Sequence, residues 1–141
     1  MEPKTFTIFF ILVLILVTSF IFIGYSHTLD KVTYYTPLAD NYVTRVIDGD
    51  TFVINSGETI RLLCVDTPEK NTTGYEEATT YLESLILNKE VILNPSITNK
   101  DQYGRLLRYV YVENNFVNKL ILDNQYGELL IIPPENCTEM N

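Results

Sequence analysis

The longest apolar stretch of the chain lies near its amino terminus. Residues 6–23 carry no charged side chain, and only threonine and serine interrupt the aliphatic and aromatic residues. As a helix, residues 6–24 would cover roughly 28 Å at about 1.5 Å per residue, close to the hydrocarbon thickness of a bilayer. No polar stripe divides the run, which argues against an amphipathic helix lying on a membrane surface. We therefore expect one transmembrane helix over residues 6–24, after a short tail at residues 1–5.

A cleaved secretory signal is the competing interpretation of this run. The apolar part of such a signal spans about 7–15 residues and ends at small residues in an A-x-A-like pattern. Here the run is longer, and residues 23–27 (I-G-Y-S-H) form a poor cleavage site. Lys4 favours a cytoplasmic amino terminus, although Glu2 offsets its charge. We expect a single-pass anchor in the cell membrane that contacts the lipid bilayer, with the rest of the chain extracytoplasmic, or secreted if the segment is cleaved.

From residue 42 onward, short β-rich segments replace the apolar run. Turn residues at 55–58 join two of them into a hairpin. Apolar residues at helical spacing predict a helix over residues 75–88, and a second, short helix begins after Asn115 and ends near Gly127. The predicted strands are residues 42–47, 51–54, 59–65, 91–94 and 106–112.

Three strands, a helix, two strands and a helix favour a small closed five-stranded barrel with helices, an α+β fold, over a parallel sheet. A parallel sheet would need more crossover helices. We expect a tether at residues 25–41, the barrel domain at residues 42–134 and a tail at residues 135–141. A chain of 141 residues is long enough for one such core and too short for two.

Composition narrows the range of functions. The chain has a formal net charge of −8, which argues against a basic nucleic-acid coat protein. Two cysteines and one histidine cannot form a structural zinc site or a disulfide-dense mini-protein. We expect Cys64 to be a core residue, with pairing to Cys137 in an oxidising exterior as the alternative.

Carboxylates gather at the ends of two predicted strands. Asp48 and Asp50 stand at i and i+2, so their side chains point to the same side of an extended chain. Asp66 and Glu69 lie on the loop that follows the third strand, where Pro68 limits the backbone. A solvated turn and a polar loop are the plain alternatives for these two clusters.

Two arginines accompany these carboxylates. Arg61 lies in the third predicted strand, and Arg105 enters the last one from the D-Q-Y-G-R segment at residues 101–105; a surface turn with an ion-paired arginine is the alternative for that segment. Aspartate oxygens can hold a hard divalent cation, which polarises a phosphoryl oxygen. Guanidinium groups bind phosphate through forked donors, and Glu69 is a candidate base for an attacking water. The residues therefore predict metal-dependent phosphoryl chemistry.

The motifs that carry these residues resemble those of the staphylococcal nuclease (thermonuclease-like) family. They are V-I-D-G-D-T at 46–51, I-R-L-L at 60–63, V-D-T-P-E at 65–69, E-A at 77–78, and D-Q-Y-G-R-L-L at 101–107 followed by Y-V-Y at 109–111. They follow the family's order across about residues 42–134. The resemblance implies a five-stranded OB-fold barrel and calcium-dependent hydrolysis of DNA and RNA, with the bond to the 5′ oxygen cleaved.

The resemblance also implies a role for each charged position. Asp50 and Asp66 match the calcium-binding carboxylates, Thr67 matches the residue that binds calcium through its carbonyl, and Asp48 matches a nearby acidic position. Glu69 matches the base that acts on water. The positions matching the phosphate-binding set are Arg61, Arg105 and Tyr103. Because no charged position is missing, we expect an active nuclease; the alternative is a membrane-anchored OB-type module that binds nucleic acid or another ligand without turnover. No protein partner is indicated.

Two departures from the family and one geometric conflict accompany this resemblance. The loop at residues 70–74 is short, and L-I-I at residues 130–132 stands where the best-known family member has tyrosines that pack on the base. Arg61 and Asp66 are five residues apart, so in an ideal strand they would face opposite sides. We therefore predict a backbone irregularity before Asp66.

Overall fold

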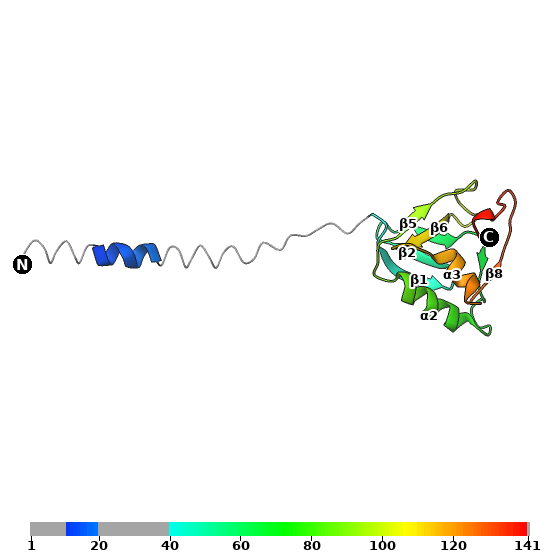
Figure 1. Cartoon of the computed structure of the whole chain (residues 1–141), viewed down its shortest axis with the longest axis horizontal. Helices are drawn as coiled ribbons and strands as arrows, with labels where there is room; N and C mark the ends of the chain where they lie inside the picture. Colours follow the sequence, from blue (N-terminus) through cyan, green and yellow to red (C-terminus); the bar gives the residue numbers. More distant parts are fainter. Residues whose placement is uncertain (1–10, 20–39, 141) are drawn as a thin grey trace, which may run out of the picture. The chain divides into compact units, whose positions relative to one another are not determined.

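The computed structural model describes residues 11–19 and 40–140 (Figure 1). The chain divides into two compact units, Met1–Pro37 and Leu38–Asn141. Residues 11–19 are helical, and no helix within the described ranges is both long enough and apolar enough to cross a bilayer. The predicted anchor at residues 6–24 extends beyond the described residues 11–19 on both sides. Most of the predicted tether at residues 25–41 also lies outside the described residues.

The second unit is an α+β fold built on a six-stranded sheet. Its strands follow the order β1-β2-β3-β6-β5, with β7 paired to β6. All pairs are antiparallel except β3 with β6. A second, two-stranded sheet pairs β4 with β8. The bounds are β1 Val43–Asp48, β2 Thr51–Ile54, β3 Thr59–Leu62, β4 Val65–Asp66, β5 Ile92–Asn94, β6 Leu106–Val112, β7 Asn115–Phe116 and β8 Glu128–Leu129.

Within residues 40–140 the predicted closed barrel is not formed, because no ladder joins the two ends of the strand order. Strands β1 and β5 are connected instead through an isolated bridge between Tyr42 and Glu90. Next to it, the Val43 amide donates to the carbonyl of Lys89 at 2.9 Å, and the Asn88 amide donates to the carbonyl of Val43 at 3.1 Å. The segment that meets β1 is the turn after helix α2 (Tyr75–Ile86), and β5 itself is only three residues long. A ladder long enough to close the sheet therefore has no strand to form on.

Two helices cover the sheet. Helix α2 (Tyr75–Ile86) buries Ala78, Leu82 and Ile86 and packs on β1, and α3 (Val117–Asp123) packs on β6 (Figure 1). Helix α2 begins after Gly74, whose φ of 91° is strained for other residues. Both helices are shorter than predicted. Helix α2 ends at Ile86 rather than at residue 88, and α3 covers only the middle of the segment predicted between Asn115 and Gly127.

A buried asparagine ties α3 to the strands that carry the polar clusters. The Asn118 carbonyl oxygen accepts from the Val110 amide at 2.8 Å. Its amide nitrogen donates to the carbonyl of Leu63 at 2.9 Å and to that of Arg108 at 3.1 Å. Because a buried polar group must be satisfied, these three bonds fix the backbone where β3 ends beside β6.

The carboxyl-terminal segment belongs to the core and is not the tail predicted from sequence. Glu135, Cys137 and Met140 are all buried. Cys137 forms a disulfide with Cys64, whose Cα lies 5.8 Å away. Cys64 is therefore a core residue, as predicted, but it is bonded rather than free. We call residues 130–140 the strap.

Candidate active site

A sharp change of backbone direction brings Arg61 and Asp66 to one side of the chain. Strand β3 ends at Leu62, and Cys64 adopts a left-handed φ of 61° before β4 begins. Arg61 Nη2 then donates to Asp66 Oδ1 at 3.0 Å and to the carbonyl of Val65 at 3.4 Å. The predicted irregularity before Asp66 is present, and it removes the conflict with strand alternation.

Asp50 is the most enclosed carboxylate of the site, with 3% of its surface exposed. Its Oδ1 accepts from Thr51 Oγ1 at 2.8 Å and from Arg61 Nη1. Its Oδ2 accepts from both the amide and the hydroxyl of Thr67, each at 3.3 Å. Burial raises the pKa of Asp50 to about 6, against the opposing effect of the Arg61 charge. The buried carboxylate therefore depends on a nearby positive charge to remain ionised.

The turn that carries Asp48 and Asp50 needs glycine between them. A Cβ on Gly49 would lie 2.7 Å from the Ala78 Cβ and 2.8 Å from Thr67 Oγ1. The absence of a side chain thus lets this turn lie directly against α2 and against the threonine that bonds Asp50. Within the turn, Asp48 Oδ1 accepts from the Asp50 amide at 3.2 Å.

A second loop holds Arg105. Asp101 Oδ2 accepts from Arg105 Nε at 2.6 Å, and its Oδ1 accepts from the Tyr103 amide at 2.9 Å and the Arg105 amide at 3.0 Å. Partial burial favours a higher pKa for Asp101, but the hydrogen bonds from Arg105 and the Tyr103 amide outweigh it and lower the pKa. The guanidinium carbon lies 5.3 Å from the centre of the Tyr103 ring, which is 75% exposed.

Glu69 lies apart from these contacts. It is exposed on the loop after β4, where its main-chain carbonyl accepts from the Thr72 hydroxyl at 2.6 Å. Its carboxylate makes no hydrogen bond or ion pair with the described part of the chain, although it lines the same cavity as Arg61 and Arg105.

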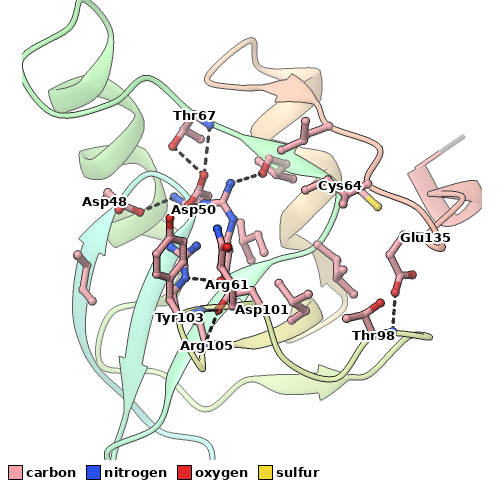
Figure 2. A pocket seen from close by; sticks show the side chains of 18 of the residues that line it. Asp48, Asp50, Arg61, Cys64, Thr67, Thr98, Asp101, Tyr103, Arg105 and Glu135 are labelled. Carbon is pink, nitrogen blue, oxygen red and sulfur yellow. Dashed lines mark hydrogen bonds and ion pairs between the residues drawn. The ribbon is translucent and has the colours of Figure 1, made fainter.

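One cavity of about 780 Å³ connects the clusters. All the candidate metal, phosphate and base residues predicted from the sequence line this cavity except Asp66, which contacts the set through its ion pair with Arg61. In Figure 2 the labelled aspartates and arginines lie on the left of the cavity, while Cys64, Thr98 and Glu135 lie on the right. The cavity thus has a polar end, which carries these aspartates and arginines, and a second end beside the strap.

The second end was missed by the sequence reasoning. Its wall includes Leu107 from β6 and Leu130, Ile132 and Pro133 from the strap. The buried Glu135 holds the strap in place, because its carboxylate accepts from Ser96 Oγ at 2.6 Å and from the Thr98 amide at 2.7 Å. The L-I-I stretch was visible in the sequence, but its place in the cavity wall depends on the disulfide and on Glu135.

The polar end offers the donor type that calcium prefers. Calcium could take oxygen ligands here from the carboxylates of Asp50 and Asp66 and from the carbonyl of Thr67. The positively charged Arg61 guanidinium bridges the two carboxylates. In the described ranges, however, no group of three or more His, Cys, Asp or Glu lies close enough to hold a metal. The residues therefore fit a hard cation in chemical type, with two carboxylates rather than a preassembled cluster.

Comparisons with known proteins show the family to which the chain belongs. Residues 59–136 match the family model described as "Staphylococcal nuclease homologue". The chain is 33% identical over 103 residues, 67% of its length, to a thermonuclease of Staphylococcus intermedius, and covers 61% of that protein. It is 35% identical over 86 residues, 55% of its length, to a thermonuclease of Staphylococcus hyicus, covering 51% of it.

A third relative comes from another genus. Over 88 residues, 55% of its length, the chain is 36% identical to endonuclease YncB of Bacillus subtilis (strain 168), covering 42% of that protein. The chain thus spans about two fifths to three fifths of these curated relatives. Since the family model alone covers more than half of the chain, this protein belongs to the staphylococcal nuclease family.

Proposed function

We propose that this chain is a calcium-dependent nuclease that hydrolyses phosphodiester bonds of DNA, RNA or both. The observation that carries the proposal is the meeting of Arg61 from β3 and Arg105 from the loop before β6 with the buried Asp50 at one cavity. Relatives named thermonuclease and endonuclease match 55% to 67% of the chain.

The two arginines would bind the scissile phosphate. Guanidinium groups donate paired hydrogen bonds to phosphoryl oxygens, and these bonds strengthen as negative charge accumulates in the transition state. The Arg105 guanidinium is bound to Asp101 only through Nε, and its terminal nitrogens make no hydrogen bond to any described residue. Tyr103, beside this guanidinium, would contact the same phosphate.

We assign the cation site to Asp50, Asp66 and the carbonyl of Thr67, with Asp48 as a nearby acidic group. When bound, calcium would neutralise charge on a phosphoryl oxygen and polarise it. Arg61 contacts both carboxylates, so it acts on the same oxygens as the proposed cation. The bridging guanidinium and the hydrogen bonds from Thr67 keep Asp50 aligned at the edge of the cavity.

Glu69 would take the proton of the attacking water. Its carboxylate lines the cavity and has no partner among the described residues that would have to be displaced. The water oxygen bonds to phosphorus, the bond from phosphorus to the 5′ oxygen breaks, and the leaving 5′ oxygen acquires a proton.

A binding module without turnover is the second candidate function. Such a module would bind nucleic acid or another ligand, and the net charge of −8 and the aliphatic strap residues that line the second end of the cavity favour a ligand other than nucleic acid. A polyanion would be repelled at long range, and a base would find no aromatic ring to stack on there.

A cleavage assay separates the two functions. The purified full-length chain in mild detergent is incubated with labelled single-stranded DNA and RNA, with calcium and then with chelator. We expect calcium-dependent cleavage that is lost in Glu69→Gln, whereas Glu113→Gln, a change on the remote turn between β6 and β7, retains it. Tight oligonucleotide binding without cleavage by the folded, calcium-loaded protein would favour the binding module.

We also propose that the second unit works outside the cytoplasm, tethered through residues 6–24. The Cys64–Cys137 disulfide supports this location, because disulfides persist in oxidising compartments. Membrane fractions washed with high salt should retain the protein, and external protease should reach it in intact cells. A soluble mature form that begins near Tyr25 would contradict the tether.

A further inference from the structure

We propose that Asp101 is a positioning residue that holds the Arg105 guanidinium with its two terminal nitrogens available to a phosphate. The inference rests on the proposed function and adds a residue to it. It starts from an asymmetry in how the two oxygens of one carboxylate are used.

One oxygen of Asp101 shapes the loop. Oδ1 accepts the amides of Tyr103 and Arg105, at 2.9 and 3.0 Å. Main-chain bonds close the same turn: the Asp101 amide donates to the Arg105 carbonyl at 3.0 Å, and the Gly104 amide donates to the Asp101 carbonyl at 3.1 Å. The turn is therefore held by several bonds of which Oδ1 accepts only two.

The other oxygen holds the side chain. Oδ2 accepts from Arg105 Nε at 2.6 Å, a charge-assisted bond at the inner edge of the guanidinium plane. The guanidinium carbon also lies over the Tyr103 ring, 5.3 Å from its centre. Because Nε is already bonded to Asp101, the outer fork of two amino groups is the part that remains for a ligand.

Such anchoring lowers the entropy that Arg105 loses when it binds. A free arginine has many rotamers, and ordering it during binding costs affinity for the transition state. The ion pair is partly exposed, with 25% of the Arg105 side chain and 15% of the Asp101 side chain accessible, so it contributes little to overall stability. Loss of the pair should therefore change catalysis much more than folding.

The test is Asp101→Asn in the full-length chain. Asparagine keeps a carbonyl oxygen for the two backbone amides but replaces Oδ2 with an NH₂ group that cannot accept from Nε. The matched control is Asp123→Asn, which removes the remote Lys119–Asp123 pair of the same i,i+4 spacing at 2.9 Å.

We expect Asp101→Asn to lower kcat on a labelled oligonucleotide about tenfold. KM should change little, because loss of the negative charge strengthens phosphate attraction while loss of order weakens it. The thermal midpoint should stay near that of the wild type, and Asp123→Asn should change neither kinetic constant. In an Arg105→Lys background, Asp101→Asn should cause no further loss, since the group that it positions is gone. An unchanged kcat in the single variant, or additive losses in the double variant, would overturn the proposal.

An NMR measurement decides the same question without catalysis. The ¹⁵N order parameter of Arg105 Nε should be high in the wild type and fall below about 0.6 in Asp101→Asn. An equally low order parameter in the wild type, or an unchanged one in the variant, would overturn the positioning role. A wild type without nuclease activity but with an ordered Arg105 that Asp101→Asn releases would refute the proposed function alone.

Discussion

The two arginines of the cavity are held in opposite ways. Both terminal nitrogens of Arg61 are bound by carboxylates, one by the buried Asp50 and the other by Asp66. Arg105 is bound to Asp101 through Nε, with its terminal nitrogens unbonded within the described ranges. One guanidinium therefore neutralises the acids that we assign to the cation, and the other presents donors to the cavity. An arginine on β3 and one on the loop before β6 thus have different roles, because different edges of the guanidinium are occupied.

The disulfide provides the largest expected effect and tests whether this contrast depends on the strap. Replacing Cys64 and Cys137 together by serine opens a loop with a sequence separation of 73. The free energy of unfolding should fall by about 4 kcal/mol, because a disulfide that closes a loop of this length restricts the unfolded chain and destabilises it by about that amount. Urea unfolding of the double variant and the wild type measures the difference. Below the unfolding transition both arginines should keep their partners, and a loss of the Arg105 Nε order there would make the contrast depend on the strap.

Removing each guanidinium in turn tests the shared part of their roles. Arg61→Gln and Arg105→Gln should each lower kcat/KM by about 10²–10³, the usual loss for one preorganised transition-state donor. Cleavage of a labelled oligonucleotide at saturating calcium measures both variants. Arg45→Gln, an exposed change on β1, serves as the control and should retain activity. An undiminished rate in either cavity variant would remove that arginine from the proposed mechanism.

Calcium affinity should separate the two arginines. Arg61→Gln should bind calcium about tenfold more tightly, because the guanidinium that shares the carboxylates with the ion is gone. Arg105→Gln should bind calcium as the wild type does. Titration calorimetry on chelator-treated protein measures both constants, independently of activity. Weaker binding in Arg61→Gln would mean that the guanidinium orders the carboxylates more than it competes for them.

The smallest expected effect is a pair of opposite pH dependences. The raised pKa of Asp50, about 6, means that the folded state holds this proton more strongly than the unfolded state, so its contribution to stability falls as the pH rises from about 4 to 6. The lowered pKa of Asp101 gives a contribution that is present above its ordinary value of 3.8 and is lost as the pH falls. Unfolding free energies of the wild type, Asp50→Asn and Asp101→Asn between pH 3 and 7 should give difference curves of opposite slope. Difference curves whose slopes have the same sign would contradict the different environments of Asp50 and Asp101.

The chemistry of the polar end could be predicted from the sequence because it is carried by short motifs. Asp48 and Asp50 share one turn, and Arg105 follows Asp101 within a single loop, so local geometry already places each group near its neighbour. Even the irregularity before Asp66 followed from a local conflict in strand alternation. The predicted helices and most strands followed from periodicity for the same reason, but the predicted strand 59–65 is divided into β3 and β4, and the two-residue strands β7 and β8 were not predicted.

Two features of the fold could not be obtained in this way. Closure of the predicted barrel requires β1 to pair with a segment more than forty residues away, and between the described residues the structure forms there an isolated Tyr42–Glu90 bridge with a few neighbouring main-chain bonds instead of a ladder. The strap is placed by Glu135 and by the Cys64–Cys137 bond, both of which join distant parts of the chain. No periodicity within a single segment records such contacts.

The sequence by itself determined the family, the α+β class and the charged groups of the candidate site, because each depends on residues close together along the chain. Tertiary structure alone decided that Arg61 bridges Asp50 and Asp66 while Arg105 keeps its outer nitrogens available. It also decided that the strap forms the second end of the cavity. The physical reason is that a guanidinium's role depends on which of its edges meets an acceptor, and that is set by how strands and loops lie together in the folded chain.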